Sequence, residues 1–177
     1  MEIPASAVKE LREKTGAGVM ECKRALQESE GNVDKAIEAL RQKGLAKHAK
    51  VAGRATSQGL VESYIHTGGR IGALVEVNCE TDFVARTDEF RTLARELAMQ
   101  VASMNPGTVG TLDSEGEGDG SALLDQEYIR DARKTIRDLI KETIAKVGEN
   151  IQISRFIRFE VGTSPQEGDG SRNGTEQ

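Results

Sequence analysis

The sequence contains no tryptophan, and aromatic residues make up only 3% of its 177 positions. The core must therefore be built mainly from Leu, Ile, Val and Ala. No apolar run approaches the roughly 20 residues that a membrane-spanning helix needs, and no signal peptide precedes the first helical pattern. We therefore expect a soluble protein that stays in the cytoplasm and binds no membrane.

Cysteine and histidine are also scarce, with two residues of each. Cys22 and Cys79 lie far apart in the sequence, and neither belongs to a CxxC or Cys/His cluster with metal-ligand spacing. The sequence therefore favours neither a structural zinc site nor a required disulfide. The net charge of −5 argues against general nucleic-acid binding.

The polar residues that could serve catalysis lack the neighbours that such chemistry needs. No Ser or Cys stands in a glycine elbow, and no glycine loop of the phosphate-binding type or calcium-loop pattern occurs. The remaining candidates are four carboxylates and two histidines: Glu80, Asp82, Asp88, Glu89, His48 and His66. We predict that the protein is not an enzyme and needs no cofactor or metal.

The first 52 residues have the apolar periodicity of helices alone. Gly16 to Gly18 and Gly31-Asn32 interrupt this pattern, and Asn32 is a suitable N-cap. Three apolar stripes at helical spacing remain: Val8, Leu11 and Thr15; Cys22, Ala25, Leu26 and Ser29; Val33, Ala36, Ile37 and Leu40. The sequence therefore predicts a three-helix domain over residues 1–52.

A basic stretch without acidic residues follows the third stripe, and residues 53–58 have the small, polar composition of a linker. The basic residues are Arg41, Lys43, Lys47, Lys50 and Arg54. A solvated helix end explains them better than a nucleic-acid surface, because no aromatic residues are interleaved for base stacking.

After this linker the apolar period changes from 3.6 to 2. Residues 60–65 and 71–77 predict two antiparallel strands joined by a hairpin at Gly68-Gly69. On the second strand, Ile71, Ala73, Val75 and Val77 would face the core. A helix capped by Thr87 or Asp88 follows and ends before Pro106 and Gly107. Its apolar residues form one stripe: Phe90, Leu93, Ala94, Leu97, Val101 and Met104.

The remainder predicts one more helix and one more strand. Residues 105–121 form a Gly-rich acidic stretch that we expect to be a mobile loop. An apolar stripe from Ile129 to Val147 predicts a long helix, residues 151–161 a last strand interrupted at Arg155 and Phe156, and residues 162–177 a disordered tail. The fold class is therefore α+β, with a three-stranded antiparallel sheet and two helices in a core domain over residues 59–161.

The segment Thr81-Asp82-Phe83-Val84 leaves the second strand and contains one of only four phenylalanines. From the residues alone, Phe83 is either a plug for the protein's own core or a probe for something else.

Three segments together resemble bacterial translation elongation factor Ts. They are TGAGVMECKRAL at Thr15 to Leu26, EVNCETDFVAR at Glu76 to Arg86, and KVGENIQISRFIRFE at Lys146 to Glu160. Their order and separation fit the family, and the resemblance covers nearly the whole chain except the acidic loop and the tail.

The resemblance implies a guanine-nucleotide exchange factor that acts in translation elongation. Such a factor binds elongation factor Tu carrying GDP, displaces magnesium and promotes GDP release so that GTP can bind. By the family's pattern, Thr81, Asp82, Phe83 and Val84 enter the partner's GTPase domain near its magnesium site. The three-helix segment resembles the family's ubiquitin-associated-like domain, and Leu11, Val19 and Met20 are the candidates for its partner-binding surface.

The chain carries one copy of the core unit, whereas some family members carry two and a projecting helical hairpin. Short members tend to recover the missing surface as homodimers, so we predict a homodimer, with the unpaired edge strands of the sheet as one contact. A monomer helped by the mobile loop is the alternative. Two other hypotheses remain: a plain interaction module that binds without exchange, and a small ribonucleoprotein component that uses the basic stretch and binds in a salt-dependent way.

Overall fold

The computed structural model of this protein describes residues 3–112 and 120–163, apart from the side chain of Leu45. The chain divides into two units. The first unit comprises residues 1–54 and 141–150, and the second unit comprises residues 55–140 and those from 151 onward. Residues 141–150, predicted to belong to the core domain, therefore group with the helical segment. Much of the predicted acidic loop (113–119) and of the predicted tail (164–177) lies outside the described residues.

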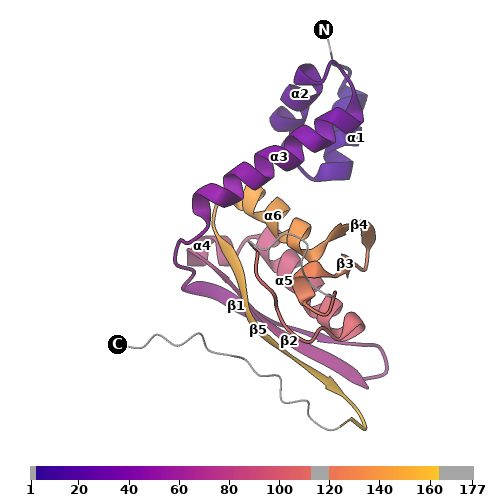
Figure 1. Ribbon diagram of the computed structural model, residues 1–177, viewed down its shortest axis with the longest axis vertical. Helices are drawn as coiled ribbons and strands as arrows, with labels where there is room; N and C mark the ends of the chain where they lie inside the picture. Colours follow the sequence, from indigo (N-terminus) through magenta and orange to yellow (C-terminus); the bar gives the residue numbers. More distant parts are fainter. Residues whose placement is uncertain (1–2, 113–119, 164–177) are drawn as a thin grey trace. The chain divides into compact units, whose positions relative to one another are not determined.

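The N-terminal part of the first unit consists of three helices, as predicted (Figure 1). They are α1 (Ala5–Thr15), α2 (Val19–Glu28) and α3 (Val33–Val51). Gly16 ends α1 in the left-handed conformation, with φ of 62°, and its N–H donates to the carbonyl of Arg12. Asn32 caps α3 by accepting a hydrogen bond from the Lys35 amide at 3.0 Å. The breaks between the helices therefore fall where glycine and asparagine predict them.

The predicted stripes form the core of this unit. Its buried members are Ile3, Val8, Leu11, Cys22, Ala25, Leu26 and Ala36. Ala7, Ala17, Val33, Ile37 and Leu40 pack around them. Helix α3 continues beyond the third apolar stripe through the basic stretch to Val51, as expected of a helix end. Three of those basic side chains form ion pairs within the unit: Arg41 with Glu38, Lys43 with Glu28, and Lys47 with Glu21. This pairing favours a solvated helix end over a nucleic-acid surface.

The second unit contains a three-stranded antiparallel sheet in the order β1-β2-β5 (Figure 1). Its strands are β1 (Gln58–Ile65), β2 (Ile71–Cys79) and β5 (Ile151–Glu160). The hairpin between β1 and β2 turns at Gly68 and Gly69, both with positive φ. Ala73, Val75 and Val77 of β2 are buried as predicted.

Helix α5 (Asp88–Met104) packs against this sheet and begins at Thr87, whose side chain caps it. Its apolar stripe is buried from Phe90 to Val101 as the sequence predicts, but Met104, predicted to continue that stripe, is exposed at the last turn. The buried face of the sheet and this stripe together form the core of the second unit. A four-residue helix, α4 (Asp82–Ala85), connects the end of β2 to α5 and contacts β1 and β2.

Strand β5 contains an irregularity at the position where its alternation is interrupted. Arg155 pairs with Glu76, but Ile153 pairs with the next residue, Val77, so that Ser154 is an extra residue. Before this bulge the odd-numbered side chains of β5 face the core, and after it the even-numbered ones do. Ile151 is buried, whereas Ile157 and Phe159 are exposed. The bulge thus moves two large apolar side chains to the outer side of the sheet.

The prediction of one long helix from Ile129 to Val147 is wrong in its first part. The short helix η1 (Leu123–Asp125) and a two-stranded ladder of β3 (Glu127–Tyr128) and β4 (Asp131–Thr135) come first. Helix α6 covers only Ile136–Val147. The Thr135 amide donates to the Asp138 carboxylate at 3.0 Å, and the Asp138 amide donates to the Thr135 hydroxyl at 3.2 Å. This reciprocal capping starts the helix at Ile136.

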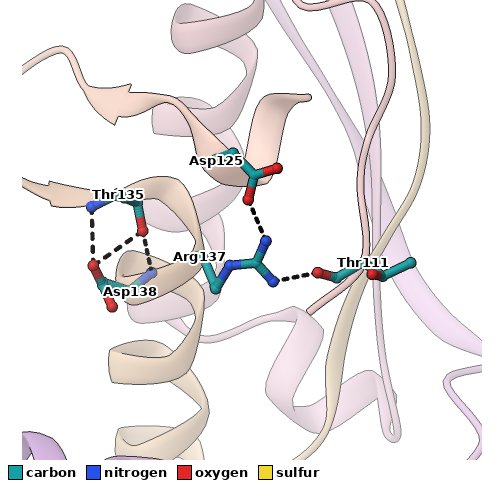
Figure 2. Close-up of polar contacts among 5 residues, drawn as sticks. All are labelled: Thr111, Asp125, Thr135, Arg137 and Asp138. Carbon is teal, nitrogen blue, oxygen red and sulfur yellow. Dashed lines mark hydrogen bonds and ion pairs between the residues drawn. The ribbon is translucent and has the colours of Figure 1, made fainter. Parts of the chain in front are cut away.

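The segments on either side of residues 113–119 are joined to each other. The amide of Gly107 donates to the carbonyl of Ser121 at 2.9 Å, and the amide of Leu123 donates to the carbonyl of Thr108 at 2.8 Å. The buried guanidinium of Arg137 adds a bridge, because it donates to both the Thr111 carbonyl and the Asp125 carboxylate (Figure 2). The described ends of the predicted loop are therefore held together at one base.

Candidate functional site

The predicted site segment, Thr81 to Val84, lies just after the end of β2, whose last residue is the buried Cys79. Thr81 is the N-cap of α4, and its hydroxyl accepts a hydrogen bond from the Val84 amide at 3.3 Å. The carbonyl of Thr81 accepts from the Ala85 amide at 3.2 Å, which closes the single turn. The strand therefore leads directly into a turn with a defined conformation.

Within this turn, neighbouring side chains have opposite environments. The Phe83 side chain is 78% exposed, whereas Val84 and Ala85 are buried. Phe83 therefore does not plug the core of the described structure. Val84 is anchored in the protein, so its predicted entry into a partner would require α4 to move. An exposed phenyl ring on an anchored turn is suited to insertion into another molecule.

Asp82 forms an exposed ion pair beside this ring. Its carboxylate lies 2.9 Å from the guanidinium of Arg86, and the two side chains are 64% and 75% exposed. Exposed pairs of this kind contribute little to stability, about 0–1 kcal/mol. The carboxylate is thus available to a partner without a large cost to the fold.

The residues predicted to form the partner-binding surface of the first unit also include both exposed and buried side chains. Val19 and Met20, the first two residues of α2, are 52% and 70% exposed. Leu11 is fully buried, so the prediction of Leu11 as a surface residue is wrong. Its place on the apolar stripe of α1 assigns it to the core instead.

The residue after this exposed pair fixes α2 to the rest of the first unit. The ammonium of Lys47 lies 2.8 Å from the Glu21 carboxylate and donates to the carbonyl of Ala145 at 3.0 Å. The hydrogen bond from Lys47 lowers the pKa of Glu21 below its ordinary value. The start of α2 is therefore held by an ion pair to α3, and the same lysine of α3 is bonded to α6.

Comparison with known proteins identifies the family. A family model described as Elongation factor TS matches residues 5–117 and 80–166. A protein named Elongation factor Ts from Thermoanaerobacter sp. (strain X514) is 50% identical over an alignment that covers 90% of this chain and 95% of the relative. A protein of the same name from Rippkaea orientalis (strain PCC 8801 / RF-1) is also 50% identical, over 99% and 86% of the two chains.

This chain belongs to the elongation factor Ts family. The relationship confirms the resemblance carried by the three sequence segments, and it supports a role in translation elongation. A third relative, from Fervidobacterium nodosum, is 46% identical over 92% of this chain and the whole of the relative, so the similarity is not confined to those three segments.

In this elongation factor Ts homologue, two of the candidate catalytic residues lie at opposite ends of β2. His66 lies in the hairpin at the start of β2, and Asp82 follows the other end of that strand. His48 belongs to α3, in the other unit. Among residues 3–112 and 120–163, no group of three or more His, Cys, Asp or Glu could hold a metal ion. In the same part of the chain, no helix is long and apolar enough to cross a membrane.

One further surface was not predicted from the sequence. Large apolar side chains are exposed on the side of the sheet opposite the core, and we call this the outer face: Val61 and Ile65 of β1, Leu74 of β2, and Ile157 and Phe159 of β5. Leu74 pairs directly with Ile157, and Gly72 lies between Ile65 and Phe159 in the register. The signal was Leu74, an apolar residue at the position that should alternate with the buried Ala73 and Val75.

Proposed function

We propose that this protein is a guanine-nucleotide exchange factor that binds elongation factor Tu carrying GDP, displaces its magnesium ion and promotes GDP release so that GTP can bind. The observation that supports this function is the exposed ring of Phe83 on an anchored turn, in a chain of the elongation factor Ts family. The function requires no catalytic residue, cofactor or metal of its own.

The proposed activity is a coupling of two binding equilibria. If the protein binds nucleotide-free elongation factor Tu more tightly than the GDP-bound form, it must weaken GDP binding by the same factor. Each 1.4 kcal/mol of that difference is a tenfold change in affinity. Burial of one phenyl ring contributes roughly 1.5–3 kcal/mol. Insertion of Phe83 alone therefore supplies about one to two orders of magnitude.

Two groups beside the ring contribute in different ways. The carboxylate of Asp82 brings negative charge to a place where the partner balances the charge of magnesium. Val84 and Ala85 keep the turn seated on its own sheet, so that the ring and the carboxylate enter the GTPase domain together. In the first unit, the exposed side chains of Val19 and Met20 bind the GTPase domain at a second place.

We also propose that the protein is a homodimer that associates through the outer face. The predicted contact was the edge strands, but the exposed apolar side chains lie on the face and span all three strands. Contiguous exposed apolar patches are typical of interaction sites. A second copy fits this face, because a self-complementary apolar surface can be buried symmetrically by a twofold axis.

The exchange function is tested by stopped-flow release of a fluorescent GDP analogue from elongation factor Tu. The parent protein should accelerate release, and Phe83→Ala should reduce the acceleration about tenfold to a hundredfold because the buried ring is lost. Met104→Ala is the matched control, since Met104 is an exposed apolar residue at the far end of α5. This variant should release GDP at the parental rate.

Two outcomes would contradict the proposal in different ways. A parent protein that binds elongation factor Tu but leaves GDP release unchanged would be an interaction module, with no exchange activity. If Phe83→Ala accelerates GDP release as much as the parent does, the exchange function stands, but Phe83 is rejected as the inserted probe.

A further inference from the structure

Helix α4 is too short to hold its own conformation. It has four residues, whereas isolated helices shorter than about 12 residues are marginal in water. The direction of the Phe83 side chain therefore depends on contacts that surrounding residues make with this turn. Two such contacts involve the backbone carbonyls at the two ends of α4, and both come from small side chains.

The first contact fixes the entrance of the turn. The thiol of Cys79 donates to the carbonyl of Thr81 at 3.1 Å. Cys79 is fully buried and is the last residue of β2, where it pairs with Gln58 and Ile151 on the two neighbouring strands. Since the sheet holds this residue on both sides, its thiol is a fixed donor rather than a group that follows the turn.

The second contact fixes the exit. The hydroxyl of Thr87 donates to the carbonyl of Val84 at 2.8 Å and accepts from the amide of Phe90 at 3.3 Å. Phe90 is fully buried in the core beneath α5. One side chain therefore joins the last turn of α4 to the first turn of α5, and a hydroxyl group is needed because it must donate and accept at once.

We propose that Cys79 and Thr87 are positioning residues that hold α4 from both ends and so keep Phe83 in the orientation that promotes nucleotide release. This inference rests on the proposed exchange function. Neither side chain needs to touch the partner, because each acts through a carbonyl of the turn. Orienting the ring before binding reduces the ordering cost that association would otherwise carry.

The first test measures the turn itself by amide hydrogen exchange in the full-length protein. Cys79→Ala and Thr87→Val each remove a donor, and the exchange of the Val84 and Ala85 amides should become about three- to tenfold faster. Cys79→Ser and Thr87→Ser retain an O–H donor and should restore slow exchange. The Val101 amide, in the buried part of α5, should be unchanged in all four variants.

The second test separates positioning from general loss of stability. In stopped-flow release from elongation factor Tu, Cys79→Ala and Thr87→Val should lower the maximal release rate about three- to tenfold. The half-saturating concentration should change less than twofold, since Val19 and Met20 remain available. The serine variants should recover the maximal rate. A variant that merely unfolds in part would recover the full rate when more protein is added.

The results distinguish this inference from the proposed function. Unchanged amide exchange in both donor-lacking variants overturns the inference, as does faster exchange together with a parental maximal rate. If Cys79→Ala does not fold, Thr87→Val and its serine control decide the matter. If the parent protein does not accelerate GDP release from elongation factor Tu, the exchange function is rejected, and so is a role of Cys79 and Thr87 in that release. The amide exchange data still determine whether these two residues hold the turn.

Discussion

Phe83, like Phe159 of the outer face, is an aromatic residue whose environment is the reverse of what its chemistry favours. Phe90, seven positions later, is completely buried, whereas Phe83 is 78% exposed between two residues of a structured turn. An apolar ring in water gains free energy only when another surface covers it. The residue therefore carries binding free energy that the protein's own fold does not use.

The neighbouring Asp82 offers a test of charge without a large change in stability. Asp82→Asn breaks the ion pair with Arg86, and Arg86→Gln breaks the same pair while keeping the carboxylate. The free energy of unfolding of both variants, measured in urea, should lie within about 0.5 kcal/mol of the parent's, because the pair is exposed. If the carboxylate acts on the partner, Asp82→Asn should slow GDP release and Arg86→Gln should not.

Equal losses in both variants would contradict this assignment. They would mean that the ion pair orients the turn and that the Asp82 carboxylate has no separate role in the partner's magnesium site. Urea unfolding of both variants is measured alongside the release rates, so that a difference in folding cannot be mistaken for a difference in charge.

Single residues also mark the limit of what the sequence predicts. Periodicity placed Leu11 on the buried stripe of α1, while the family resemblance suggested it for the partner-binding surface, and the buried position is the correct one. A resemblance assigns a function to a segment but does not say which of its side chains the core occupies. Val19 and Met20, next to a glycine-rich break, are exposed because they precede the first core residue of α2, Cys22.

At the scale of elements, the sequence predicted best where a cap and a regular period agree. Helix α5 has the predicted bounds because Thr87 caps it, one apolar stripe runs along it, and Pro106 follows its end. The region before α6 has no such agreement. Apolar residues at helical spacing from Ile129 onward concealed the β3-β4 ladder, and only the Thr135-Asp138 capping pair marks the true start.

The bulge in β5 explains the other failure. Ile151, Ile153, Ile157 and Phe159 share one parity in the sequence, but the extra residue Ser154 divides them between opposite sides of the sheet. A bulge depends on pairing with a neighbouring strand, which a single strand's pattern does not contain. The outer face was therefore beyond prediction from β5 alone, although the apolar Leu74 of β2 was a visible signal.

The contact between α2 and α3 should make the stability of the first unit depend on pH. The pKa of Glu21 is lowered in the folded protein by its hydrogen bond from Lys47. The carboxylate therefore contributes stability that is fully present above its unfolded pKa of 4.5 and is lost as the pH falls through the lowered folded value. Glu21→Gln should remove this part of the pH dependence.

Urea unfolding of the parent and of Glu21→Gln, from neutral pH to pH 3, measures the difference. The variant should be less stable at neutral pH by up to about 1 kcal/mol, because the pair is partly exposed, and the two proteins should converge in acid. The free energy of unfolding of Lys47→Gln should depend on pH in the same way as that of Glu21→Gln. Parallel curves for parent and Glu21→Gln would show that the pair does not stabilise the fold.

At the scale of the whole molecule, the proposed dimer depends on the outer face. Phe159→Asp should weaken the dimer at least a hundredfold, since twofold symmetry removes two buried rings and adds two charges at one interface. Sedimentation velocity over a range of concentrations measures the effect. Met104→Asp, outside the face, should leave the dimer intact. A monomeric parent, or a dimer unaffected by Phe159→Asp, would reject this interface.

The outer-face row beside the β1-β2 hairpin and Phe83 lie at different ends of the same sheet. Ile65, Gly72 and Phe159 form a row beside the β1-β2 hairpin, whereas Phe83 follows Cys79 at the other end of β2. Cys79 lies seven residue steps along β2 from Gly72, roughly 23 Å at 3.3 Å per step. Association centred on this row would therefore leave Phe83 of each protomer uncovered, and each could engage its own partner molecule.

The bridge made by Arg137 makes the chain between Thr111 and Asp125 a place where the sequence can become longer. Because Thr111 and Asp125 are tied to the same guanidinium, the chain between them starts and ends on a fixed base (Figure 2). The entropy of closing a flexible segment inserted between two fixed ends grows only with the logarithm of its length, and doubling the length costs about 0.6 kcal/mol. This position is therefore a permissive insertion point, where evolution or protein engineering can add a long segment while the sheet and α5 keep their structure.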